Sequence, residues 1–147
     1  MFVTQQIKIL GVLAALFWLA ATAVIRCFPA CVTDPVWGSA QFVLTVPICW
    51  VCVDAVRRRA RLAPEQLVPG TAIVVATEML MDATALRWAH VIYGNTDLID
   101  RLAAAWLLWG YAISLGCALV MARRKSLQLQ GAAAQGGRAV AKLATFS

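Results

Sequence analysis

Charged residues are scarce in this chain. Asp, Glu, Lys and Arg make up only 14% of its 147 residues, whereas 62% of the residues are hydrophobic. In soluble globular domains about a quarter of the residues are charged. The low charge therefore excludes an ordinary soluble domain and predicts a polytopic membrane protein, with enough chain for one small domain.

Histidine is almost absent, since His90 is the only one. The chain has five cysteines, Cys27, Cys31, Cys49, Cys52 and Cys117. None of them combines with His90 at the spacing of a zinc site. Cys49 and Cys52 have the C-x-x-C spacing of redox centres, but they lie in an apolar run and are better interpreted as small buried residues. No nucleophile and base stand at a recognisable spacing, so we expect no metal, no cofactor and no enzymatic activity.

Four apolar runs are long enough to cross a membrane as helices, for which about 20 residues are needed. They cover residues 9–25, 37–56, 69–93 and 102–122. We therefore predict an all-α fold, a four-transmembrane-helix bundle formed by residues 1–125, with Pro47 bending the second span. Residues 126–147 are rich in Ala, Gly and Gln, so we expect a flexible cytoplasmic tail there.

The first apolar run allows two interpretations. It can be a permanent span, with Lys8 and Arg26 reaching the two membrane surfaces. It can also be a cleaved secretory signal, because a basic start and an apolar core precede the small-residue triplet Ala21-Thr22-Ala23. The permanent span is favoured because the run is long and the next apolar run follows at once.

Lysine and arginine lie mostly on one side of the predicted bundle. Ten of the thirteen belong to the N-terminus, to the loop after the second run or to the segment after the fourth run. The other three, Arg26, Arg87 and Arg101, belong to the opposite side. Because cytoplasmic loops carry the excess of positive charge, we expect a multi-pass protein of the bacterial inner (plasma) membrane with both termini cytoplasmic (N-in/C-in). The net charge of +6 then reflects topology and does not indicate nucleic-acid binding.

The third run contains two acidic residues, Glu78 and Asp82. They are four residues apart, so they project from the same face of a helix. Carboxylates are costly in the hydrocarbon core, which turns this face toward the interior of the bundle. Two interpretations stay open. The pair can form a proton relay or cation site of a transporter, or it can fix helix packing through hydrogen bonds to Thr45, Ser114 or the backbone.

The rotation of the third span follows from this acidic face. We expect this span to be the most enclosed of the four. Its predicted inward positions are Val74, Val75, Ala85 and Ala89. Its predicted outward or neighbour-facing positions are Ile73, Leu80, Arg87 and Val91.

Three further ionisable residues could make proton or partner contacts. Arg87 and His90 follow the acidic pair toward the outer surface, and Asp54 ends the second span. Arg87 can meet lipid headgroups or the acids Asp97 and Asp100. A lone histidine at a membrane boundary is usually interfacial, although its ordinary titration range also suits a proton carrier.

Two features are expected at the outer side of the bundle. Cys27 and Cys31 would face an oxidising compartment, where they could form a disulfide if the turn at Pro29 brings them together. Aromatic residues at this level predict an interfacial belt. Its members are Trp37, Trp88, Tyr93, Trp106 and Trp109.

Two stretches carry a resemblance to a known family. They are MLMDATALRWAHVIYGN at residues 79–95 and AAWLLWGYAISLGCALV at residues 104–120. They resemble the third and fourth helices of a family of small four-helix bacterial inner-membrane proteins of unknown function. The resemblance implies the fold and the membrane location, and it singles out Asp82 among the ionisable residues. It implies no activity.

Two functions fit these observations. The acidic pair and the Pro47 bend favour a small proton- or cation-linked transporter. Four helices enclose little space, so a transporter of this size would act as a homo-oligomer, in the simplest case a homodimer. The small size favours instead an accessory or assembly subunit that binds a partner membrane protein and has no chemistry of its own. In both cases the lipid bilayer is the surrounding medium.

Overall fold

The computed structural model describes the backbone of residues 2–94 and 96–144 and the side chains of residues 2–89, 91–94 and 96–128. The elements in chain order are α1 (Thr4–Cys27), α2 (Ala30–Thr33), α3 (Pro35–Arg59), α4 (Pro64–Trp88), the 3₁₀ helix η1 (His90–Ile92) and α5 (Asp97–Ala144). The described part of the chain contains no strand. Four helices, α1, α3, α4 and α5, are long and apolar enough to cross a membrane. The all-α fold with four spans is therefore confirmed.

Side chains near the starts of α3 and α4 bind free backbone N–H groups there. Asp34 precedes α3, and its Oδ1 atom accepts the backbone N–H groups of Val36 and Trp37 at 2.8 and 2.9 Å. Pro35 then occupies the first helical position, where a missing N–H costs nothing. α4 begins at Pro64, five residues before the predicted start, because Gln66 accepts the N–H of Ala63 through its side chain.

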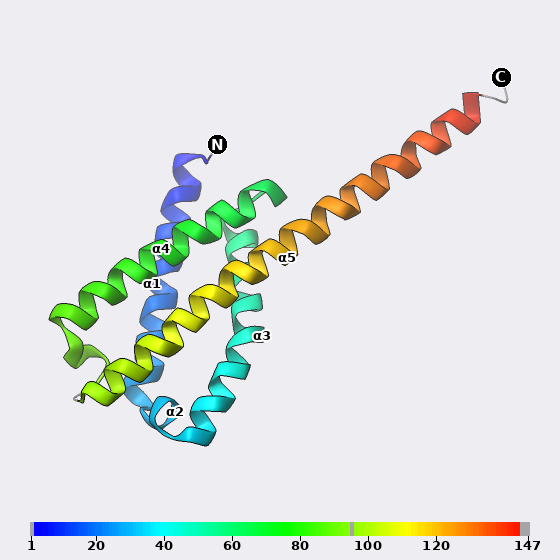
Figure 1. The fold of residues 1–147 in the computed structure, drawn as a ribbon. Coiled ribbons are helices and arrows are strands. Elements are labelled where there is room, and N and C mark those ends of the chain that lie inside the picture. Colours follow the sequence, from blue (N-terminus) through cyan, green and yellow to red (C-terminus); the bar gives the residue numbers. More distant parts are fainter. Residues whose placement is uncertain (1, 95, 145–147) are drawn as a thin grey trace.

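The four spans form a bundle in which α4 and α5 are central. The most extensive contacts join α4 to α5, α3 to α5 and α1 to α4, whereas α1 and α3 touch little. Figure 1 shows the N-terminus and the α3–α4 connection at one end of the bundle, the end from which α5 emerges toward the C-terminus. The short helix α2 and the α4–α5 connection lie at the other end. We call the end with the N-terminus the terminal end, and the end with α2 the α2 end.

α4 is the most enclosed span, as its acidic face predicted. In an apolar stretch of 18 residues within α4, 33% of the residues are buried, whereas the corresponding stretches of the other spans are 17 to 22% buried. Val74, Val75 and Ala85 are buried, whereas Leu80 is 70% exposed. Ala89 and Ile73 are half-buried, and Arg87 and Val91 are exposed. The predicted rotation is therefore confirmed for Val74, Val75 and Ala85, whereas Ala89 follows the end of α4 and is not buried.

The end of α4 differs from the prediction. The helix stops at Trp88, and η1 follows before the chain reaches Tyr93. We expected Tyr93 in the interfacial belt, but it is only 1% exposed and packs in a cluster at the α2 end with Ile25, Ala85 and Leu107. The 3₁₀ turn is what directs this side chain back into the bundle. Trp37 and Trp88 are exposed, as a belt requires.

α5 is longer than the fourth apolar run. Its backbone stays helical for 48 residues, to Ala144, and Figure 1 shows that it projects well beyond the other helices. We expected the helix to end near residue 122. Once a helix is nucleated, each added residue gains one backbone hydrogen bond, so an alanine-rich stretch can extend it although it also contains Gly131, Gly136 and Gly137. The mobility of residues 126–144 stays a prediction, and residues 145–147 lie outside the described part.

Candidate intramembrane carboxylate site

Asp82 is buried inside the bundle, with 4% of its surface exposed. Trp18 of α1 donates its indole N–H to Oδ1 at 2.7 Å. The hydroxyl of Tyr93 also donates to Oδ1, and the hydroxyl of Tyr111 from α5 donates to Oδ2. Three neutral donors thus satisfy the carboxyl group, as burial of such a group requires. This carboxyl group connects α1, α4, α5 and the turn after η1.

Two of the three donors, Trp18 and Tyr93, also contact each other. The indole N–H of Trp18 lies 3.2 Å from the hydroxyl oxygen of Tyr93 and donates to it as well as to Asp82. The chain contains two tyrosines, and both donate to the same carboxyl group. No cation contacts Asp82 among the described side chains. The network therefore holds the carboxyl group in place through hydrogen bonds alone.

Glu78 lies one helical turn before Asp82 and is half-buried. Its Oε1 atom is shielded from solvent and has no hydrogen-bond partner in the described part of the chain. Glu78 is close enough to interact electrostatically with Asp82 and with the thiols of Cys49 and Cys52 on α3. Most buried polar atoms in proteins have a partner, so an unpaired one needs an explanation. The two carboxyl groups therefore differ: Asp82 is satisfied, and Glu78 is not.

A third polar group shares this face of α4. Thr71 precedes Glu78 by seven residues, which is close to two helical turns. Its side chain is buried, and the hydroxyl oxygen has no hydrogen-bond partner among the described residues. Thr71, Glu78 and Asp82 thus form a row of polar groups along α4, which we call the polar row. Two of its three members have an unpaired buried oxygen.

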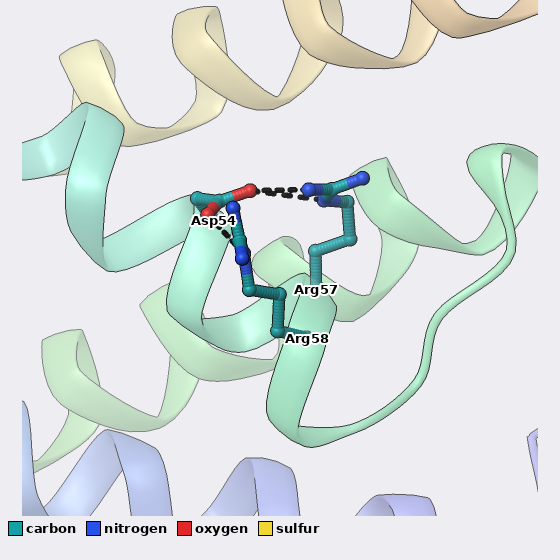
Figure 2. A network of polar contacts seen from close by, with 3 residues as sticks. All are labelled: Asp54, Arg57 and Arg58. Carbon is teal, nitrogen blue, oxygen red and sulfur yellow. Dashed lines mark hydrogen bonds and ion pairs between the residues drawn. The ribbon is translucent and has the colours of Figure 1, made fainter.

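Arg87, His90 and Asp54 were the other candidates for proton or partner contacts. Arg87 is exposed and has no ion pair within the described residues. The side chain of His90 lies outside the described part. Asp54 lies near the C-terminus of α3, at the terminal end of the bundle. Its carboxylate pairs there with Arg57 and Arg58 at 2.5 Å each (Figure 2). Asp54 is therefore part of a separate basic cluster and not of the carboxylate site.

The cysteine pair at the α2 end is reduced in this structure. Cys27 is exposed, Cys31 is half-buried, and both are free thiols. Formation of a disulfide between them stays a prediction. A count of three free thiols in the denatured, unreduced protein would establish it, because the chain has five cysteines. A count of five would exclude it.

Sequence reasoning found Asp82 but not its partners. We expected Thr45 or Ser114, yet the hydroxyl of Thr45 accepts the indole N–H of Trp106 at 2.8 Å and donates to the carbonyl of Gln41. The true partners, Trp18 and Tyr111, are polar-tipped aromatic residues inside apolar runs. Such residues usually find a hydrogen-bond partner when they are buried, and this signal could have pointed to them.

Comparison with known proteins places the chain in a family. Residues 31–125, more than half of the chain, match a family of unknown function, DUF5367. The match contains Asp82, Tyr93 and Tyr111, but it begins after α1 and so leaves out Trp18. No curated protein and no solved structure matches the chain. The chain therefore belongs to the DUF5367 family and is a multi-pass integral membrane protein with four candidate spans.

Proposed function

We propose that this protein is a small proton- or cation-linked transporter that acts as a homo-oligomer. In this proposal Glu78 binds and releases the ion, and Asp82 is a fixed acceptor beside it. The observation that carries the proposal is the buried, unpaired Oε1 atom of Glu78, one turn from the fully hydrogen-bonded Asp82. Ionisable residues inside membrane spans commonly mark ion pathways.

The hydrogen bonds favour Glu78 as the carboxyl group that would exchange the ion. An ion arriving at Asp82 would compete with two donors at Oδ1 and one at Oδ2. An ion arriving at Oε1 of Glu78 would displace no donor. Two neighbouring carboxyl groups in a low dielectric are not both ionised cheaply, so Asp82 also makes a proton or cation at Glu78 more favourable. Glu78 is therefore the better exchange group.

The polar row suggests a direction for the ion. Thr71 lies about 10 Å from Glu78 along the helix, nearer to the terminal end. This distance is too long for a direct transfer, so the ion would cross it through water that enters between the helices. The unpaired hydroxyl of Thr71 would supply a hydrogen-bonding group on that route.

A second copy of the chain is needed for a complete pathway. Glu78 is only half-buried, so it lies near the surface of a single bundle. Two hollows among the described residues lie at the terminal end, and neither carboxyl group of the pair lines them. A second bundle packed over Glu78 would close it off from lipid and provide the other wall of a pathway.

One observation favours a second candidate function, that of an accessory or assembly subunit. α5 continues as a helix far beyond the bundle, where no other element of the described chain covers its backbone (Figure 1). A projecting helix of this kind can bind a partner protein. In this alternative the Asp82 network only stabilises the bundle. In neither case do we propose an enzymatic activity or a nucleic-acid partner.

The proposed location is the bacterial inner membrane with both termini in the cytoplasm. Cys27 is exposed at the α2 end, and Arg59 is exposed at the terminal end. In intact cells treated first with a membrane-impermeant reductant, which opens any Cys27–Cys31 disulfide, we expect a membrane-impermeant maleimide to label Cys27 and not a cysteine introduced as Arg59→Cys. After cell lysis both positions should react. Labelling of the Arg59→Cys thiol in intact cells, with Cys27 protected, would reverse the proposed orientation.

The function is tested in proteoliposomes that contain the purified protein. A potassium diffusion potential is imposed, and an enclosed pH-sensitive dye reports proton entry, with a sodium-sensitive dye in a parallel sample. We expect protein-dependent entry of one of the two ions. Cross-linking or mass measurement should show more than one chain in the active preparation. A strictly monomeric protein without ion flux would instead support the accessory function.

A further inference from the structure

A groove of about 340 Å³ lies between the end of α3, the start of α4 and the middle of α5. Its apolar walls come from Leu62, Leu67 and Met121. Its polar groups come from Arg57, Lys125 and Gln128. The groove thus combines an apolar surface with two basic side chains at the terminal end of the bundle.

The charge of this groove is positive. No acidic residue lines it, and Lys125 has no ion pair in the described part of the chain. A neighbouring hollow of about 500 Å³ also borders α4 and α5, but it is lined by the acidic Glu65 as well as by the basic Arg123. An anion therefore finds favourable charges in the first groove and mixed charges in the second.

Arg57 is held in position by a neighbour. Its Nε and Nη2 atoms donate to Oδ1 of Asp54 at 3.1 and 2.5 Å, and its side chain is only 23% exposed. Figure 2 shows one guanidinium nitrogen of Arg57 pointing away from Asp54. The same carboxylate also pairs with Arg58, so one negative charge faces two positive ones. Arg57 therefore keeps both a free donor and part of its charge.

We propose that this groove binds an anionic phospholipid. The phosphate would lie between Arg57 and Lys125, with Gln128 donating a hydrogen bond, and an acyl chain would lie along Leu67 and Met121. Basic pockets between helices at a membrane surface are suited to anionic headgroups. A free phosphate would use the charges but not the apolar wall, which is why a lipid fits better. This site does not depend on the proposed ion transport.

The test counts lipids bound to the intact protein. The protein in detergent micelles is titrated with phosphatidylglycerol, and in parallel with phosphatidylcholine of the same chains, and native mass spectrometry measures bound lipid. We expect one phosphatidylglycerol to be retained preferentially. The double change Arg57→Gln/Lys125→Gln should weaken its binding about tenfold or more, since each basic residue near a membrane surface contributes about 1 kcal/mol.

The matched control removes two cations outside the groove. Arg59 and Arg61 are exposed at the same end of the bundle but do not line the groove, and Arg59→Gln/Arg61→Gln should change the affinity less than about twofold because solvent and salt screen exposed charges that do not contact the lipid. Unfolding temperatures of all variants verify that they are folded. Equal losses in both double variants would overturn the site, because the attraction would then be a diffuse charge effect. Displacement of the lipid by inorganic phosphate at millimolar concentration would overturn the lipid identity, and equal retention of phosphatidylcholine would do the same.

Discussion

Replacement of Asp82 by leucine is expected to destabilise the bundle by about 3 kcal/mol. The change leaves the N–H of Trp18 and the hydroxyls of Tyr93 and Tyr111 without their buried acceptor. An unsatisfied buried donor costs about 1–3 kcal/mol, and a hydrogen bond between membrane helices averages about 0.6 kcal/mol. Three lost hydrogen bonds at about 1 kcal/mol each therefore give the expected loss of about 3 kcal/mol. Reversible denaturant titration in mixed micelles, followed by tryptophan fluorescence, measures the free energy of unfolding.

Asparagine at the same position should be much milder, costing about 1 kcal/mol. The amide oxygen can still accept two donors, and the hydroxyl of Tyr111 can rotate to accept from the amide nitrogen. Leu80→Ala is the control, because Leu80 is on the exposed side of the same helix and should change stability by less than about 0.5 kcal/mol. Wild-type stability of Asp82→Leu would show that the network contributes nothing to the fold.

A double-mutant cycle separates the hydrogen bond from other effects of these substitutions. Tyr111→Phe should cost about 1 kcal/mol in the wild type, because it removes one donor to Asp82. In the Asp82→Leu background the same change should cost nothing or stabilise, because the hydroxyl no longer has its acceptor. Additive losses would mean that Tyr111 acts through packing.

Glu78→Gln should lower ion transport to the level of empty liposomes. The amide has nearly the shape of the carboxyl group, but it does not bind a proton near neutral pH and carries no negative charge to attract a cation. Since Oε1 of Glu78 has no partner to lose among the described residues, the free energy of unfolding should change by less than about 1 kcal/mol. The initial rate of dye response in proteoliposomes gives the activity, and the micelle titration gives the stability.

The control for this variant is Glu65→Gln, the same chemical change at an exposed position in the first turn of α4. Its transport rate should match that of the wild type. If Asp82→Asn abolished transport while Glu78→Gln did not, Asp82 would be the exchange group and our assignment of roles would be wrong. If both variants transported at the wild-type rate, the pair would be structural.

The sequence could predict Asp82 as an interior residue because one physical cost dominates. A carboxyl group in hydrocarbon is so unfavourable that it sets the rotation of the whole helix, and Val74, Val75 and Ala85 then become buried by their spacing from it. The same argument could not separate Asp82 from Glu78. Both are acidic and share one face, and their difference depends on which donors the neighbouring elements bring.

By itself, the sequence determined the class of this protein, its four spans and the inward face of α4. Apolar length and the cost of buried charge act locally along one helix, so they can be read from the order of residues. Only the tertiary structure decided that Trp18, Tyr93 and Tyr111 meet at Asp82, and that Glu78 does not receive a donor. Those donors are 64, 11 and 29 residues away from Asp82 in the chain. Their meeting depends on how α1 and α5 pack against α4 and on the 3₁₀ turn that follows it, and helix packing is set by contacts between segments that no local pattern encodes.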